Sequence, residues 1–238
     1  MYCLDLTLPT PAENLACDEA LLDWCETTFN GNILRFWEPR EHFVVLGYAK
    51  RAQEDAHVDR CRRRRIPILR RCSGGGTVLQ GPGCLNFSLI LRIAAGPLRS
   101  IHGTNAFIME RHQHALEPVL GAPITIRGAT DLAIGSRKFS GNSQRRKRRA
   151  VLFHGTFLLD LDLQLMTELL PIPSQQPSYR RHRTHEAFLT NVHVPAIRLR
   201  QALQRAWQAT EPLSRVPRPL ITQLTITRYA TDAWNLMR

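Results

Sequence analysis

The stretch RRCSGGGTVLQGPGCL, residues 70–85, places two arginines and three consecutive glycines between apolar segments. Ordering a glycine loses more backbone entropy than ordering an alanine, by roughly 0.5–1 kcal/mol within a regular element. A chain keeps such a run where its backbone must approach a ligand closely or turn in a way that side chains forbid. NFSLIL, which follows at once, is typical of a strand. The segment therefore predicts a glycine-rich loop between two strands, with cations beside it.

The glycine run Ser73–Gly76 lacks the spacing of a P-loop and of a dinucleotide-binding fold. A triple glycine alone is more often a flexible turn than a ligand site. Here, however, Arg70 and Arg71 end the strand that is predicted before it. Backbone N–H groups of such a loop can bind phosphate oxygens, and an arginine adds a bidentate fork. The pattern indicates a site that faces phosphate.

Two further stretches carry polar residues that suit a ligand. Lys138 lies between two glycines in GSRKFSGNSQ, residues 135–144. Its compact ammonium suits a carboxylate and then the oxygens of an acyl phosphate, with an exposed surface lysine as the alternative. In FHGTFLLDLDL, residues 153–163, the polar group His154–Thr156 interrupts an apolar strand. This hints at a side chain aimed into a pocket, although a lone histidine there is more often structural.

The charge is the unusual property of the composition. The 238 residues, 43% hydrophobic and 22% charged, suit one globular domain with an ample core. The net charge of +12 is gathered in residues 60–67, 145–149 and 179–183. Such clusters suggest an anionic partner, either nucleic acid or an acidic protein surface, with a solvated basic face as the alternative.

The sequence favours a cytoplasmic protein with reduced cysteines. It holds no run of eighteen apolar residues and no basic-then-apolar leader, so we expect neither a membrane span nor a secretion signal. No cysteine pair has C-x-x-C spacing, and the nearby histidines show no zinc-like partnering with them. Mostly buried thiols are expected for Cys3, Cys17, Cys25, Cys61, Cys72 and Cys84.

Predicted strands outnumber predicted helices, and hairpins outnumber β-α-β units. Helices are expected near residues 14–27 (with Asn14 as the cap), 54–65, 106–120, 163–170 and 194–210. Residues 32–39 and 42–49 are expected to form a pair of strands, and residues 221–236 a strand followed by a turn or helix. We therefore expect an α+β fold with a mixed, largely antiparallel sheet flanked by helices. No repeat or second core region is evident, so residues 1–238 are expected to form one domain.

In order and spacing, RRCSGGGTVLQGPGCLNFSLIL, TDLAIGSRKFSGNSQRR and FHGTFLLDLDL resemble the lipoate–protein ligase family. The upstream segment ILRFWEPREHFVVLGYAK is also similar, so the resemblance covers residues 33–163. It implies the catalytic domain shared with biotin ligases and octanoyl transferases, a fold related to class II aminoacyl-tRNA synthetases. It also implies that lipoate reacts with ATP, usually with Mg²⁺, to give lipoyl-AMP and pyrophosphate. The lipoyl group then passes to a lysine of an acceptor protein.

The resemblance also implies the site residues. Lys138 matches the family's key lysine, which binds the acyl carbonyl and the phosphate oxygens. Asp131 is the first candidate for the base that serves the incoming amine. The residues implied to bind substrate or adenylate are Arg71, Ser73, Gly74, Gly75, Gly76, Thr77, Asn86, Asp131, Ser140, Gly141, His154, Gly155 and Thr156. An acyl-adenylate is already reactive, so positioning and charge stabilisation should dominate.

Two departures from the family keep a transferase open as the alternative. The small C-terminal domain of many bacterial lipoate ligases is not expected here, so the chain is expected to use a separate accessory chain, to need none, or to perform only transfer. The related octanoyltransferases use a cysteine nucleophile, and neither RGATDLAIGSRK nor VLFHGT contains one. Cys72 or Cys84 as a displaced nucleophile is the weaker interpretation. The missing cysteine favours a ligase.

The basic clusters suggest how an acceptor is recognised. Lipoyl acceptors such as the glycine cleavage H protein or a dehydrogenase E2 domain are generally acidic, so RRKRR (145–149) is expected to steer docking. A nucleic-acid-binding protein that has lost the chemistry is the alternative from another class, and the intact motifs argue against it. A biotin ligase is less expected because its GRGRxG-like loop is missing. The choice between lipoate and octanoate, the acceptor and the oligomeric state stay open.

Overall fold

The computed structural model describes residues 1–94 and 96–237. At its centre is an eight-stranded sheet in the order β11-β1-β2-β6-β10-β9-β8-β7. The strands are β1 (Tyr2–Asp5), β2 (Ile33–Trp37), β6 (Cys84–Arg92), β7 (Ile124–Arg127), β8 (Asp131–Ile134), β9 (Arg137–Arg146), β10 (Ala150–Leu158) and β11 (Glu211–Pro212). Neighbours from β2 to β7 pair antiparallel, while β11, β1 and β2 are parallel. The predicted mixed, largely antiparallel sheet is confirmed.

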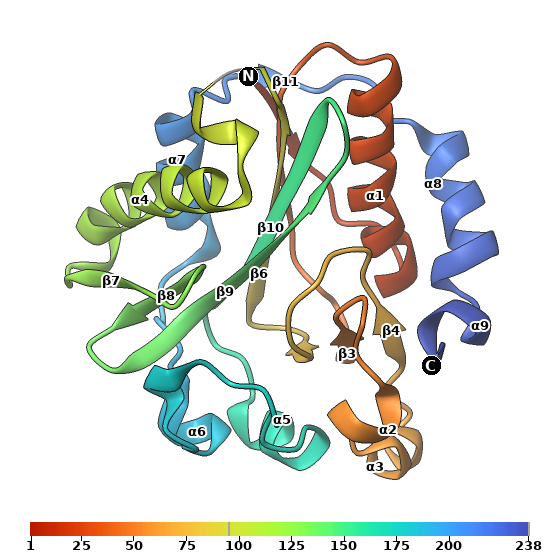
Figure 1. Ribbon diagram of the computed structural model, residues 1–238, viewed down its shortest axis with the longest axis vertical. Helices are drawn as coiled ribbons and strands as arrows, with labels where there is room; N and C mark the ends of the chain where they lie inside the picture. The colour runs from red at the N-terminus through yellow and green to blue at the C-terminus, as the bar shows by residue number, and fades with distance from the viewer. Residues whose placement is uncertain (95, 238) are drawn as a thin grey trace.

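Helices cover both faces of this sheet, as Figure 1 shows. On one face α4 (Ile101–Leu120) and α7 (Ala196–Trp207) close an apolar core against β6 and β10. On the other face lie α1 (Pro11–Thr27), α8 (Arg218–Leu224) and a small sheet in the order β4-β3-β5. The small-sheet strands are β3 (Phe43–Leu46), β4 (Ile68–Arg70) and β5 (Val78–Gln80).

Short helices close one end of the molecule. α3 (Val58–Arg63), α5 (Leu163–Leu169) and α6 (His185–Phe188) pack around a third apolar cluster under the small sheet, and α2 (Ala52–Asp55) directly precedes α3. Two 3-10 turns, η1 (Gly96–Arg99) and η2 (Ser178–Arg180), complete the connections. Within the described residues, no helix is long and apolar enough to cross a membrane.

Local signals explain where the long helices begin and end. α1 starts at Thr10, whose hydroxyl accepts from the Glu13 N–H, while the Glu13 carboxylate accepts from the Thr10 N–H. Asn14, predicted as the cap, lies inside the helix instead. α4 ends as predicted at Gly121, whose φ of 63° is easiest for glycine.

Two further predictions of local structure were wrong. β2 and β3 do not pair, because β2 joins the large sheet beside β6 while β3 lies between β4 and β5. Residues 221–236 contain no strand: α8 is followed by a π-helical turn, η3 (Thr225–Tyr229), and by α9 (Asp232–Asn235). Ile221 and Tyr229 pack against the α1 side of the core. Their spacing suits a helix, and this packing outweighs the preference of the β-branched residues for a strand.

Candidate functional site

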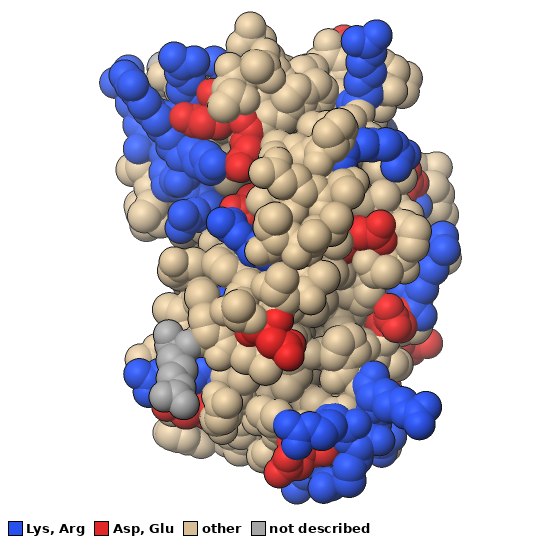
Figure 2. All heavy atoms as spheres, turned by 90° about the vertical axis from the view of Figure 1, so that its right-hand side faces the viewer, with Lys and Arg blue, Asp and Glu red and all other residues tan. Residues whose placement is uncertain are grey.

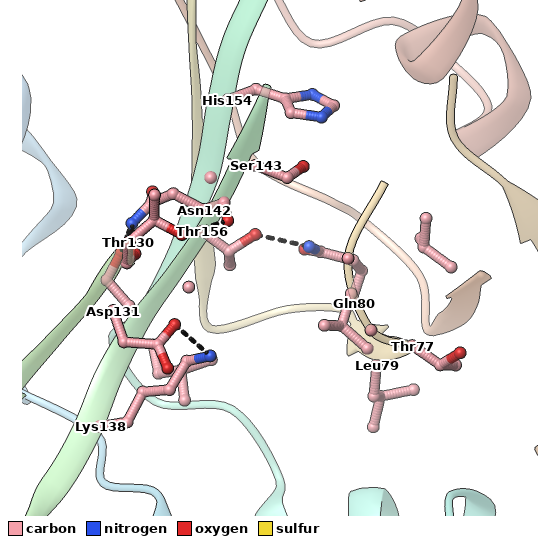
Figure 3. A pocket seen from close by; sticks show the side chains of 18 of the residues that line it. Thr77, Leu79, Gln80, Thr130, Asp131, Lys138, Asn142, Ser143, His154 and Thr156 are labelled. Atoms are coloured by element: carbon pink, nitrogen blue, oxygen red, sulfur yellow. Dashed lines mark hydrogen bonds and ion pairs between the residues drawn. The ribbon is translucent and has the colours of Figure 1, made fainter. Parts of the chain in front are cut away.

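A cavity of about 370 Å³ lies between the large sheet, the small sheet and a covering segment, residues 171–189. Figure 3 shows polar side chains from several strands directed into it. Of the fourteen residues expected to form the site, twelve line it: Arg71, Gly75, Gly76, Thr77, Asn86, Asp131, Lys138, Ser140, Gly141, His154, Gly155 and Thr156. Ser73, which is buried, and Gly74, which is exposed, are not among the lining residues. The individual roles of these residues stay predictions.

Lys138 and Asp131 form an ion pair at one end of the cavity. The Lys138 Nζ lies 2.7 Å from Asp131 Oδ1. Gly141, which pairs with Asp131 across β8 and β9, makes room for this lysine, because a Cβ there would lie 2.5 Å from Nζ. The hydroxyl of Tyr179 donates to Asp131 Oδ2 at 2.7 Å. The site thus holds an ammonium at a fixed place beside a carboxylate.

Three side chains form a hydrogen-bonded ring in the middle of the cavity. Thr156 Oγ1 donates to Asn86 Oδ1 at 2.5 Å, and Gln80 Nε2 donates to Thr156 Oγ1 at 2.6 Å. Asn86 Nδ2 closes the ring on Gln80 Oε1 at 3.1 Å. Since Gln80 belongs to β5 and the other two to β6 and β10, the ring fixes the small sheet to the large one.

The glycine loop is held from within by Arg71. Its guanidinium donates to the carbonyls of Gly74 (2.6 Å) and Gly76 (2.8 Å). Gly75 has a φ of 93°, and its carbonyl lies where a side chain at Gly47 would overlap it. Burial lowers the pKa of Arg71 to about 10, so the group stays charged at neutral pH. Arg71 therefore shapes the loop, and its predicted contact with an adenylate stays a prediction.

A buried polar chain anchors the start of the loop at the other end of the cavity. Ser73 Oγ lies 2.6 Å from His154 Nε2 and 2.7 Å from Ser143 Oγ. His154 Nδ1 lies 3.2 Å from Asp18 of α1, which pairs with Arg35 at 2.6 Å. Burial disfavours the Asp18 carboxylate, but Arg35 and the His154 hydrogen bond outweigh burial and lower its pKa. Figure 3 shows His154 and Ser143 remote from the Lys138–Asp131 pair.

Arg70, at the end of β4, joins the loop region to the C-terminal helix. Its guanidinium is buried and donates to the carbonyls of Gly47 (3.1 Å), Tyr48 (2.9 Å) and Lys50 (2.5 Å). On the C-terminal side it donates to the carbonyls of residues 234, 235 and 237. The Tyr48 N–H donates in turn to the Ser73 carbonyl. The chain leading into the glycine loop is thus fixed by backbone carbonyls from both sides.

The cysteines lie away from the chemistry. None of the six lines the cavity in the described part of the chain. Cys72 and Cys84, which flank the loop, are buried, and desolvation raises the pKa of each thiol to about 12. Both therefore stay protonated at neutral pH and are poor nucleophiles.

The cavity offers few protein ligands for a metal ion. Over residues 1–94 and 96–237, no three His, Cys, Asp or Glu side chains converge in a way that could hold a metal ion. Mg²⁺ at nucleotides is commonly held by one or two carboxylates together with phosphates and water. Asp131 and Asp18 are both paired with a cation, Lys138 and Arg35 respectively, and Asp131, whose side chain is 16% exposed against 3% for Asp18, is the one suited to such a shared role.

Several site residues were not found from the sequence. Asp18 lies in a helix of ordinary composition, and Tyr179 lies in a run interpreted only as basic. Gln80 and Ser143 stand beside motif residues. Strict alternation along β9 would place Ser143 on the face opposite Lys138, and no signal in the sequence indicated the irregular β8–β9 register at Leu132/Ala133.

Comparisons with known proteins agree on one family. The family model described as the lipoyl protein ligase A/B catalytic domain matches residues 10–211. The octanoyltransferase LipM of Geobacillus kaustophilus is 25% identical over 265 residues, covering 96% of this chain and 95% of that protein. A bi-partite lipoate protein ligase, solved with its E2 lipoyl domain from Thermoplasma acidophilum, superposes with a TM-score of 0.84 at 25% identity, covering 100% of this chain and 98% of that one. A lipoate-protein ligase A solved with bound ATP has a TM-score of 0.82 at 25% identity, with 99% of each chain covered.

Proposed function

The chain belongs to the family of lipoyl protein ligase A/B catalytic domains, and from this premise we propose that it is an ATP-dependent lipoate–protein ligase. The observation that carries the proposal is a cavity with a fixed ammonium, Lys138, and a glycine loop, but no thiol among its described lining residues. The solved relative with bound ATP supports a nucleotide as co-substrate. Residues 1–238 would act as one catalytic domain.

In the first half-reaction, a lipoate carboxylate oxygen bonds to the α-phosphorus of ATP while the bond to pyrophosphate breaks. The Arg71 guanidinium already donates to backbone carbonyls, whereas the Lys138 ammonium pairs with the Asp131 side chain at the end of the cavity. Lys138 is therefore the cation suited to bind both the lipoate carboxylate and the α-phosphate. It offsets the charge on the carboxylate and the α-phosphate as they approach, and N–H groups of the glycine loop add further donors. Positioning of the two anions is the main contribution of the protein.

In the second half-reaction, the neutral amine of an acceptor lysine attacks the acyl carbon and AMP leaves. The amine loses a proton as the amide forms. Asp131 lines the cavity beside Lys138 and accepts this proton. Lys138 stays near the carbonyl oxygen and stabilises the negative charge that develops there.

Mg²⁺ would be shared between Asp131 and the phosphates of ATP, since Asp131, although paired with Lys138, is the more exposed of the two carboxylates among the described lining residues. Bound there, the ion would neutralise charge on the departing pyrophosphate.

An octanoyl transferase is the second candidate, favoured by the similarity to LipM. The family's transferases are expected to use a cysteine, and this chain presents none to the cavity within its described residues. The protonated, buried state of Cys72 and Cys84 therefore favours the ligase.

The acceptor is proposed to be an acidic lipoyl domain. RRKRR covers the end of β9 and the turn into β10, and its Arg145, Arg148 and Arg149 are exposed. Figure 2 shows positive side chains gathered near the top and near the bottom of one face. The turn between β9 and β10 lies at the top of the molecule in Figure 1, and α3 lies at the bottom. The E2 lipoyl domain of the Thermoplasma system supports this kind of partner, and its bi-partite ligase supports a separate accessory chain.

ATP–pyrophosphate exchange by the purified chain, with and without lipoate, tests the proposal. We expect lipoate-dependent exchange that falls at least 100-fold in Lys138→Ala, because removing a preorganised charge from such a site costs about that much. Lys50→Ala is the matched control, since Lys50 pairs with Asp55 outside the cavity. Exchange without any dependence on Lys138 would refute the site.

A transferase would give a different result. Absence of exchange in a folded protein that moves an octanoyl group from a carrier-protein thioester would identify the second candidate. Exchange that appears only after a second chain is added would identify the accessory subunit.

A further inference from the structure

Tyr179 lies outside the sequence motifs and yet touches the ion pair at the centre of the proposed chemistry. Its hydroxyl donates to Asp131 Oδ2 at 2.7 Å, while Lys138 Nζ lies 2.7 Å from Asp131 Oδ1. One carboxylate oxygen is thus held by the phenol and the other by the ammonium. The plane of the Asp131 carboxylate is therefore fixed from a point 48 residues away in the sequence.

The covering segment holds Tyr179 in this place by contacts of its own. Arg183 donates to the Tyr179 carbonyl at 3.0 Å and to the Ser136 carbonyl at 3.0 Å, so it ties the segment to the β8–β9 turn. The Tyr179 ring packs on Phe188 with centroids 5.2 Å apart. The phenol therefore reaches Asp131 from a rigid support.

The electrostatics keep the phenol a donor. Burial raises the pKa of Tyr179, and the Asp131 carboxylate raises it further. The hydroxyl is protonated across the range in which an enzyme works. A lysine side chain, by contrast, has four rotatable bonds and no directional preference of its own. Lys138 can hold one position only if its partner Asp131 does.

We propose that Tyr179 is a positioning residue, which orients Asp131 and through it the Lys138 ammonium for formation of the acyl-adenylate. The inference rests on the proposed ligase function. Because misplacing a reacting group by a fraction of an ångström slows the chemical step more than it weakens binding, the effect belongs in kcat.

A double-mutant cycle separates this role from simple support of the covering segment. Tyr179→Phe keeps the ring on Phe188 and removes only the hydroxyl. We expect it to lower the kcat of lipoate-dependent pyrophosphate exchange about 5- to 20-fold, with KM for ATP and lipoate changed less than about twofold. Asp131→Asn should lower kcat further, and adding Tyr179→Phe to Asp131→Asn should change nothing more.

Tyr2→Phe, at the start of β1 and outside the cavity lining, is the control and should keep wild-type kcat. If the effects of the two changes multiply, or if Tyr179→Phe alters KM alone, Tyr179 does not act through Asp131 and the inference is wrong. Wild-type kcat in Tyr179→Phe would overturn it as well, while leaving the ligase standing. Absence of exchange in the wild-type chain, with or without an accessory chain, would overturn the proposed function and this inference together.

Discussion

Buried His112 should make the protein lose stability as the pH falls below about 6.5. His112 belongs to α4, and its ring is fully buried in the core, where its Nε2 accepts from the indole N–H of Trp207 at 3.0 Å. Burial, with a smaller contribution from Arg111, lowers the pKa of His112 from 6.5 to about 3. The unfolded chain therefore binds more protons than the native one between these pH values, so stability rises with pH there.

The size of the loss follows from these two pKa values. At pH 5 the native ring is still neutral while the unfolded ring is almost fully protonated, which costs about 2 kcal/mol relative to pH 7.5. Urea unfolding followed by circular dichroism at the two pH values measures it. His112→Leu removes the proton site, so its loss between pH 7.5 and 5 should be smaller than that of the wild type by about 2 kcal/mol.

His112→Leu also removes the acceptor of the Trp207 indole N–H, which lowers stability at both pH values. This effect cancels when the free energies of unfolding at pH 7.5 and pH 5 are compared within one variant. Met109→Leu is the control, since it changes the same core without removing a titratable group. An equal pH-dependent loss in His112→Leu and wild type would refute the assignment of this acid sensitivity to the buried ring.

Three further outcomes are expected. Arg35→Met leaves the buried Asp18 carboxylate without its arginine and with only His154 beside it, so urea unfolding at pH 7.5 should show a loss of about 3–5 kcal/mol, and a loss under about 1 kcal/mol would contradict the importance of this pair. Gly155→Ala places a Cβ that overlaps Asn142 Oδ1, so its free energy of unfolding should fall by about 1–3 kcal/mol, whereas Gly76→Ala, with no atom near its Cβ, should change much less. Iodoacetamide under native conditions should leave pyrophosphate exchange intact, because no thiol lines the described part of the cavity; rapid inactivation would indicate a cysteine in the reaction.

The parts of the site that are predictable from sequence are those with unusual local composition. Three glycines beside two arginines, and a lysine between glycines, have few structural explanations, and both stretches line one cavity. Asp18 could not be predicted as a site residue, because the composition of its helix is ordinary and its partner His154 lies 136 positions away. Tyr179 is likewise hidden in a basic run, and its contact with Asp131 depends on how the covering segment folds back.

The fold shows the same limit. α4 is predictable because its apolar spacing and Gly121 are both local. The separation of β2 from β3 is not predictable, since two short apolar runs joined by a turn have the pattern of a hairpin, and their antiparallel partners β6 and β5 come later in the chain. In the C-terminal region, β-branched residues favour a strand locally, and packing of Ile221 and Tyr229 against α1 decides for a helix.

The bonds of Arg70 bear on the order in which this protein matures at the ribosome. The glycine loop is encoded early, but the carbonyls that fix its approach lie 164 to 167 positions later. The nascent chain can therefore build the loop only loosely until almost all of these residues have emerged. Ribosome-bound chains that lack residues 234–237 are expected to be substrates for proteolysis near Gly47–Lys50, and the finished chain is expected to resist it.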